Sequence, residues 1–186
     1  MAGEIGEAIE RADREAFTRQ PPKTLKGQIG YLIRQLGSAK AVAQELGVTA
    51  DSVNRYRRGA RKHARTDVAT KIDDAVRQRW QPQVRKRRQK QAATSGGITV
   101  ETRARFGYTA PVGTTDDGRF RRLTVHLPPA YAQRLFDART AGASDQQMRG
   151  IIAEGFKEIY FQDSGGRATG LSDVTLNDID YLDLDY

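Results

Sequence analysis

The stretch 38–58 constrains the fold of this chain more than any other, because it predicts two short helices joined by a tight turn. Val42 and Leu46 lie four residues apart and therefore on one face of a first helix. Gly47 can adopt the positive φ angle that ends a helix, and Thr49 can cap the following helix through its hydroxyl. This pattern is typical of a helix-turn-helix.

The second predicted helix has one apolar and one polar face. Val53 and Tyr56 are three residues apart and are expected to face the core. The side chains left outside are Asp51, Ser52, Asn54, Arg55, Arg57 and Arg58. Such a face suits the base edges of a DNA major groove, so the stretch predicts DNA binding. The alternative interpretation is an ordinary helical hairpin with a solvated basic face.

The distribution of charge favours a nucleic-acid partner. The chain carries a formal net charge of +8. Residues 21–90 hold 18 Lys and Arg against 5 Asp and Glu, whereas residues 101–186 hold 10 against 13. Because each cation placed near a phosphate releases a condensed counterion, binding by the basic part should weaken steeply as salt rises.

The residues expected to contact DNA come from the helix-turn-helix, from the basic connector 59–65 and from a basic arm that follows it. They are Lys40, Thr49, Ser52, Asn54, Arg55, Arg57, Arg58, Arg61, Lys62, Arg65, Arg85, Lys86, Arg87 and Arg88. The run 81–91 is dense enough in charge to repel itself, which favours a phosphate-binding arm over a core element. A solvated helix face or a linker is the alternative. The small residues of 92–97 predict a flexible hinge.

Composition disfavours several other kinds of site. The chain has no cysteine, which excludes disulfides and thiolate metal sites. His63 and His126 have no partner at ligand spacing, so a zinc site is not expected. No apolar run approaches the roughly 20 residues of a membrane span, and the N-terminus lacks the pattern of a secretory signal. A cytoplasmic, nucleoid-associated protein without membrane contact is expected.

The C-terminal half changes from helical to alternating periodicity. Residues 98–102 and 123–127 each alternate apolar and polar residues and predict strands, separated by a long loop over 106–118. A helix is expected from Ala130, and a capping box at Ser144 opens another. Strand, helix and capped helix resemble a ribbon-helix-helix, which would require a homodimer through residues 120–163. The alternative is a monomeric α+β domain in which the two strands pair with each other.

Eight short segments, spread in order over nearly the whole chain, resemble the telomere terminal proteins of linear Streptomyces chromosomes and plasmids. They are Ala16–Arg19, Lys40–Gln44, Arg79–Gln83, Thr102–Arg105, Gly107–Pro111, Leu123–Pro129, Ala132–Ala138 and Ile159–Asp163. None of these segments is a widely shared motif, so their joint occurrence is specific. The length of the chain also suits that family.

The resemblance implies a protein that becomes covalently joined to the 5′ ends of linear DNA. In that family a threonine hydroxyl acts as primer, and a DNA polymerase acting in trans attaches the first nucleotide and fills the recessed end. The corresponding threonine here is Thr115, with Thr114 as the neighbouring alternative, and Tyr108 and Thr109 as weaker candidates. The divalent metal would be supplied by the polymerase, so the chain would need no cofactor of its own. Telomeric DNA and a telomere-associated DNA-binding protein are the further expected partners.

The expected fold is mainly α with a small α+β part. An N-terminal amphipathic helix (1–23), which should pack on the next unit or on a partner, precedes the helix-turn-helix domain (24–80). The basic arm and hinge (81–97) lead to the priming loop and strand-helix-helix domain (98–163). An acidic tail (164–186) alternates acidic with apolar residues and should form an edge strand or a docking strip.

Two other functions are alternatives to the protein primer. A helix-turn-helix transcription regulator fits the composition and the predicted DNA-binding region equally well. An enzyme in its own right is disfavoured, because the sequence has no acidic triad, no paired histidines and no glycine-rich phosphate loop. No catalytic residue is therefore assigned.

Overall fold

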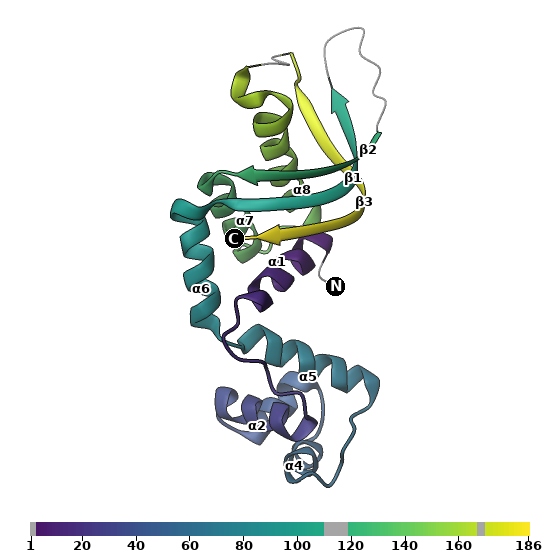
Figure 1. The fold of residues 1–186 in the computed structure, drawn as a ribbon. Coiled ribbons are helices and arrows are strands. Elements are labelled where there is room, and N and C mark those ends of the chain that lie inside the picture. Colours follow the sequence, from purple (N-terminus) through teal and green to yellow (C-terminus); the bar gives the residue numbers. More distant parts are fainter. Residues whose placement is uncertain (1–2, 110–118, 167–169) are drawn as a thin grey trace. The chain divides into compact units, whose positions relative to one another are not determined.

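The computed structural model describes residues 3–109, 119–166 and 170–186. The chain forms two compact units, coloured along the sequence in Figure 1. One, the helical unit, consists of residues 17–83, and the other, the sheet unit, combines residues 1–16 with 84–186. The fold is mainly helical with a small antiparallel sheet, which confirms the predicted fold class.

The helical unit contains four helices around one apolar core. They are α2 (Leu25–Leu36), α3 (Ala39–Leu46), α4 (Ala50–Arg58) and α5 (Thr66–Arg79). The buried side chains of the core are Ile29, Tyr31, Leu32, Val42, Ala43, Leu46, Val53, Tyr56, Val68, Ile72, Ala75 and Val76. Their helical spacing gives each helix one apolar stripe, which explains why the four helices pack together.

Tyr31 and Trp80 connect α2, the end of α5 and the segment that precedes α2. The rings of Tyr31 and Trp80 lie 4.9 Å apart between centroids. The Tyr31 hydroxyl donates to the Arg79 carbonyl at 2.5 Å, and the Trp80 indole N–H donates to the Arg19 carbonyl at 2.9 Å. The unit therefore begins earlier than the predicted boundary at residue 24, because Trp80 holds the chain that precedes α2.

The sheet unit is built from both ends of the chain. Its helices are α1 (Glu4–Glu15), α6 (Pro82–Gln91, from Val84 on), α7 (Pro129–Thr140) and α8 (Asp145–Gly155). Short helical turns follow α6 as η1 (Ala92–Gly96) and α8 as η2 (Phe156–Phe161) and η3 (Asp163–Gly165). Its strands are β1 (Ile98–Thr109), β2 (Arg119–Leu127) and β3 (Asp173–Asp185), and all pairings are antiparallel in the order β2-β1-β3.

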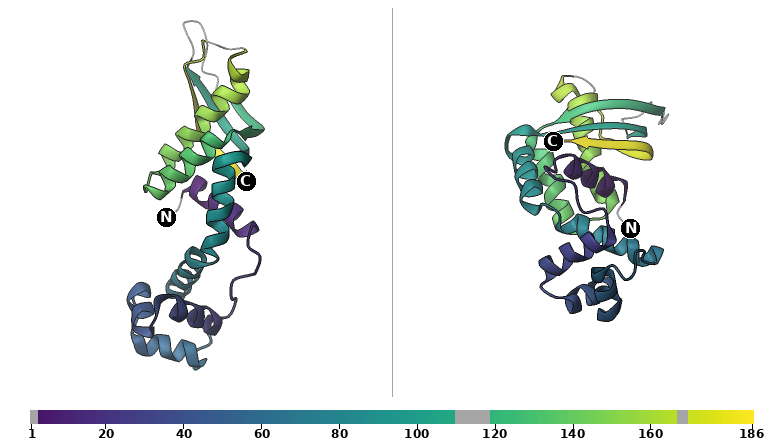
Figure 2. Two further views of the ribbon diagram at one scale, coloured as in Figure 1. Left: turned by 90° about the vertical axis from the view of Figure 1, so that its left-hand side faces the viewer. Right: turned by 60° about the horizontal axis from the view of Figure 1, so that its bottom comes forward.

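Alternation along the strands divides the sheet into a buried inner face and an exposed outer face. On β1, Val100, Ala104 and Phe106 are buried in the core, whereas Arg103 and Arg105 are exposed. Figure 2 shows helices α7 and α8 along one face of the sheet and no helix drawn across the other. The outer face of the described strands is therefore available to solvent.

The ribbon-helix-helix prediction is wrong, and the α+β alternative is confirmed. Strand β2 pairs with β1 of the same chain, with Ile98 opposite Leu127 and Thr102 opposite Leu123. The apolar stripe of α8, including Met148 and Ile152, is buried in the core of the sheet unit. Since one chain buries this stripe, the argument that required a homodimer through 120–163 no longer holds.

Both ends of the chain join the core of the sheet unit. Helix α1 was expected to pack on the next unit or on a partner, but Ile5 and Ile9 are fully buried in the core of the sheet unit. The acidic tail forms the edge strand that was one of its two predicted forms: it is β3, whose Leu182 and Leu184 enter the same core. Both ends were predicted as separate segments because their contacts are remote in sequence: β3 pairs with β1, and the Ile5 N–H of α1 donates to Asp145.

The predicted hinge and loop are also corrected in part. Residues 92–97 do not form a loose hinge: Ala92 is buried within η1, and Gly97 leads directly into β1. The predicted loop over 106–118 begins later, since β1 continues to Thr109 and Phe106 packs edge-on against Phe156 at 5.4 Å. Small residues in 92–97 permit close packing, which sequence composition cannot distinguish from flexibility.

We expect the substitution Gly97→Ala to destabilise the sheet unit by at least about 2 kcal/mol. Gly97 has φ +70° and ψ −164°, a conformation open essentially to glycine alone, and an added Cβ would lie 2.4 Å from the Leu127 carbonyl oxygen. Urea denaturation followed by circular dichroism measures the loss. Gly96→Ala is the matched control, because its Cβ would lie an ordinary 3.6 Å from the nearest atom. Equal midpoints for the two variants would contradict this account.

Candidate nucleic-acid interface

Helices α3 and α4 form the predicted helix-turn-helix. The Ser38 hydroxyl accepts from the Ala41 N–H at 3.0 Å and caps α3, and the Thr49 hydroxyl accepts from the Ser52 N–H at 3.2 Å and caps α4. Between them Gly47 has φ +67°, as the turn requires. The predicted inward residues Val42, Leu46, Val53 and Tyr56 are all buried. The local pattern thus determines both helices and the turn that joins them.

The outward face of α4 carries its arginines. Arg57 and Arg58 are exposed, and within the described residues neither guanidinium pairs with a carboxylate. Arg55 is exposed and pairs with Asp51 at 2.9 Å along the helix, while Asn54 is half-buried. Exposed pairs of this kind contribute little to stability, so Arg55 can exchange its carboxylate for a phosphate at small cost.

Two of the residues predicted to contact DNA, Thr49 and Ser52, also stabilise helix α4. Thr49 and Ser52 take part in the cap of α4, with their hydroxyl oxygens 3.0 Å apart. Thr49 remains exposed and Ser52 is half-buried. Lys40 is exposed on the first turn of α3. These side chains can still meet DNA, but replacing Thr49 or Ser52 would disturb the helix as well as the contact.

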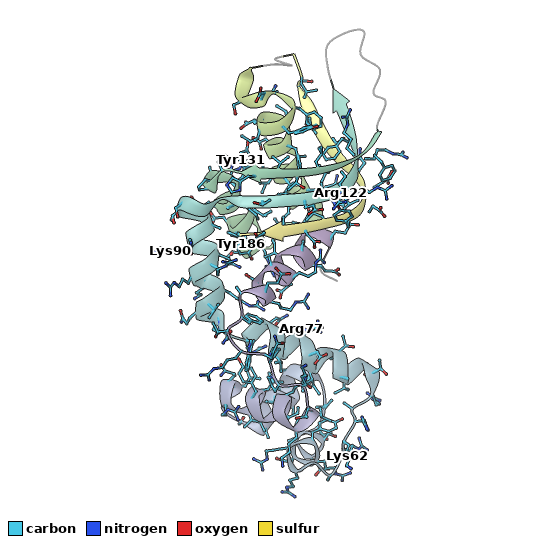
Figure 3. The ribbon with its side chains drawn as sticks, in the orientation of Figure 1. Lys62, Arg77, Lys90, Arg122, Tyr131 and Tyr186 are labelled. Atoms are coloured by element: carbon cyan, nitrogen blue, oxygen red, sulfur yellow. The ribbon has the colours of Figure 1, made fainter. Side chains whose placement is uncertain are left out.

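The connector after α4 gathers cations around a small cavity of about 240 Å³. The cavity is lined by Thr24, Leu25, Lys26, Gly59, Arg61 and Lys62. Lys62 is labelled in Figure 3. Lys26 was not among the predicted residues, although a lysine in the first turn of a helix opposes the helix dipole and could have been noticed. Arg65, further along, is exposed and pairs with Asp67 at 3.2 Å.

The predicted basic arm is helix α6, and its cations separate onto two faces. Lys86, Arg87 and Lys90 are exposed, and Lys90 is labelled in Figure 3. Arg85 keeps only 11% of its side chain exposed. Its guanidinium pairs with Glu10 at 3.3 Å and lies 3.9 Å from Asp13. The structure therefore removes Arg85 from the set of DNA contacts and leaves the exposed face of α6.

Arg88 has an intermediate position. Its side chain is 41% exposed, and its guanidinium lies 3.8 Å from the Asp185 carboxylate on β3. The same side of α6 includes Gln89, which donates to both carboxylate oxygens of Asp13 at 3.2 Å. The arginine-rich run thus serves partly as a structural helix of the sheet unit, which charge density alone did not predict.

A buried carboxylate explains why this side of α6 faces inward. Asp13 of α1 is fully buried, and its carboxylate accepts from the Tyr186 hydroxyl at 2.6 Å. Arg139 of α7 lies 3.8 Å away and also pairs with Glu10. Burial, followed by the charge of Asp13, raises the pKa of the Tyr186 hydroxyl, which therefore remains a hydrogen-bond donor. We call this set, together with Arg85 and Gln89, the Asp13 network.

The predicted acceptor threonines cannot be placed. Thr114 and Thr115 lie within 110–118, outside the described residues. The segment joins β1 to β2, which pair as far as Phe106 opposite Arg119. Thr109 is the last residue of β1. Within the described ranges no group of three or more His, Asp or Glu side chains could hold a metal ion.

Comparison with protein-family models, with curated proteins and with solved structures gave no match to this chain. Among the helices of residues 3–109, 119–166 and 170–186, none has both the length and the apolar character needed to cross a bilayer.

Proposed function

We propose that this chain is a DNA-terminal protein, which caps the 5′ ends of linear replicons and offers a threonine hydroxyl as the primer for end-patching DNA synthesis. The observation that carries the DNA-binding part is the capped helix-turn-helix with exposed Arg57 and Arg58 on α4. The resemblance to telomere terminal proteins supports the priming part. Telomeric DNA, a telomere-associated DNA-binding protein and a DNA polymerase are the proposed partners, at chromosome or plasmid ends in the nucleoid.

The proposed priming step is a phosphoryl transfer to the Thr115 hydroxyl. Its oxygen bonds to the α-phosphorus of a deoxynucleoside triphosphate, the bond to pyrophosphate breaks, and the hydroxyl proton passes to solvent in the polymerase site. Divalent metal ions of the polymerase would stabilise the charge on the transferring group. The chain itself would then act as nucleotide acceptor and would need no catalytic base.

The proposal is tested by the mass of the protein recovered from its own cells after exhaustive nuclease digestion. A residual nucleotide on the peptide that contains Thr115 supports the primer function. An unmodified protein, together with a palindromic footprint inside the chromosome, would instead support the helix-turn-helix transcription regulator. The two outcomes differ in the chemistry of the protein and do not depend on knowing the bound DNA sequence.

We expect the double variant Arg57→Ala/Arg58→Ala to bind duplex DNA at least about tenfold more weakly at low salt. If both arginines neutralise a phosphate, the slope of log affinity against log salt should fall by about 1.8, since each contact contributes roughly 0.9. Fluorescence anisotropy over a salt series measures both quantities. Arg14→Ala, which removes an exposed cation from α1, serves as the control. An unchanged slope in the double variant would show that this face of α4 does not contact phosphates.

A further inference from the structure

The outer face of the sheet carries an aromatic side chain that the fold does not bury. Phe120, on β2, is the one large hydrophobic side chain exposed among the described residues, with 48% of its surface accessible. It pairs with Arg105 of β1 and points away from the core that holds Leu123 and Val125. A single exposed ring is common on protein surfaces, so its meaning depends on the side chains that surround it.

Arginines surround the exposed ring. The guanidinium carbons of Arg105 and Arg103 lie 5.3 Å and 5.7 Å from the centre of the Phe120 ring. On the same face the guanidinium of Arg122 lies 5.9 Å from the centre of the Tyr181 ring. Arg122 is labelled at the sheet in Figure 3. We call these five residues the Phe120 patch, in which two aromatic rings are combined with three guanidinium groups.

Carboxylates hold the arginines of the patch in position. Arg103 pairs with Asp180 at 2.6 Å, and Arg105 with Asp178 at 3.5 Å. The register between β1 and β3 shifts on both sides of Ala104, so β3 has extra residues at this point, and Asp178 has φ +42°. Bulges of this kind redirect side chains. Here the irregularity brings Asp178 and Asp180 to the two arginines that lie beside Phe120.

The third arginine is held in the same way from the centre of the sheet. The guanidinium of Arg122 donates to Glu101 at 2.7 Å, and the Tyr181 hydroxyl donates to the same carboxylate at 2.9 Å. All of these ion pairs are largely exposed to solvent, and pairs of that kind contribute only about 0–1 kcal/mol. A phosphate can therefore replace a carboxylate at any of the three guanidinium groups.

An exposed ring flanked by guanidinium groups on an open sheet matches the chemistry of unpaired nucleotides. Bases that are not paired can stack on an aromatic ring or on a guanidinium plane, and arginine binds phosphate through parallel N–H donors. Bases within a duplex are already stacked and cannot reach such a ring. We propose that the Phe120 patch binds single-stranded DNA by stacking a base on Phe120.

The charges on the outer face of the sheet restrict the path of the bound single-stranded DNA. On β3 the exposed acids are Asp173, Asp178, Asp180, Asp183 and Asp185. On β1 and β2 the described outward charges are Arg103, Arg105 and Arg122 against Glu101. Because the acidic edge at β3 repels phosphates, the bound DNA should run over β1 and β2. Its base would then lie on Phe120, and its phosphates would lie near the arginines.

The choice of DNA as the single-stranded ligand rests on the proposed function. A terminal protein that primes synthesis must act where template nucleotides are unpaired. Phe120 lies close in sequence to the segment 110–118 that contains the proposed acceptor Thr115. A stacking site on β2 would hold an unpaired template nucleotide.

The test measures binding of a fluorescent oligothymidylate of about 15 nucleotides by anisotropy, with the full chain carrying Arg57→Ala/Arg58→Ala to reduce binding at α4. Phe120→Ala should weaken this binding about tenfold, within the range expected for the loss of one stacked base. Phe120→Trp should retain it, and Gln133→Ala, at an exposed position on α7, should leave it unchanged. Because Phe120 is exposed, the thermal midpoint of Phe120→Ala should equal that of the parent.

Photo-cross-linking locates the bound single-stranded DNA on the protein directly. An oligonucleotide containing 5-iododeoxyuridine should cross-link to the peptide that contains Phe120 when single-stranded, and should lose that cross-link when annealed. Unchanged affinity of Phe120→Ala, or cross-links confined to residues 17–83, would overturn the inference. If the cellular protein carries no nucleotide but the binding of oligothymidylate still depends on Phe120, the proposed function fails and the Phe120 site stands. If the protein carries a nucleotide but Phe120→Ala does not weaken the binding of oligothymidylate, the proposed function stands and the Phe120 site fails.

Discussion

Replacing Thr115 by alanine should abolish attachment of a nucleotide to the protein and leave its affinity for duplex DNA unchanged. The substitution removes the hydroxyl oxygen that would form the phosphodiester bond. The helix-turn-helix lies in the other compact unit, so its caps and its buried core are not altered. The expected loss is complete, since an acceptor oxygen is either present or absent. Mass spectrometry of the nuclease-treated protein from cells measures it.

Two neighbouring substitutions make this experiment specific. Thr115→Ser keeps an acceptor hydroxyl and should retain attachment, while Thr114→Ala should leave it unaffected. If Thr114→Ala abolishes the adduct and Thr115→Ala does not, the acceptor is Thr114. If the adduct persists when both threonines are replaced, the attachment lies outside this pair, and Tyr108 and Thr109 become the residues to examine.

Replacing Asp13 by alanine should destabilise the sheet unit by about 3–5 kcal/mol, the cost of removing one partner from a buried charge pair. Arg85 and Arg139 would lose a buried counter-charge, and the Tyr186 hydroxyl and Gln89 would lose their acceptor. Because the network joins α1, α6 and α7 to the last residue after β3, its loss loosens four segments together. Urea denaturation followed by circular dichroism measures the change.

Matched variants separate the buried carboxylate from the loss of a negative charge. Glu15→Ala removes an exposed acid from the same helix and should change stability by less than about 0.5 kcal/mol. Asp13→Asn keeps a hydrogen-bond acceptor and should fall between the two. An Asp13→Ala midpoint equal to that of Glu15→Ala would contradict the structural role of the network.

Local chemistry was sufficient to predict several elements. The caps at Ser38 and Thr49 and the turn at Gly47 appear where the pattern placed them. The capping box at Ser144 is formed with Gln147, as the sequence predicted. In each case the residues that determine the structure lie within four positions of one another, so the interactions that stabilise it can be read from adjacent sequence.

The sequence predicted which candidate DNA-binding side chains are exposed on α4, but not on α6. On α4 the exposed arginines follow from the spacing of Val53 and Tyr56, which fixes the buried face of that helix. On α6 there is no apolar stripe to mark an inner face. Only the distant carboxylates of Glu10 and Asp13 decide that Arg85 faces inward. Arginine composition alone could not separate a structural cation from an exposed one.

By itself, the sequence determined the helix-turn-helix, the alternation of the strands and the mainly helical class, because these depend on periodicity and on short-range caps. Only the tertiary structure decided that the two ends of the chain join one core and that β3 pairs with β1 along the edge of the sheet. It also decided that Phe120 stands exposed between arginines. Such features arise from contacts between residues far apart in the chain, for which local pattern carries no signal.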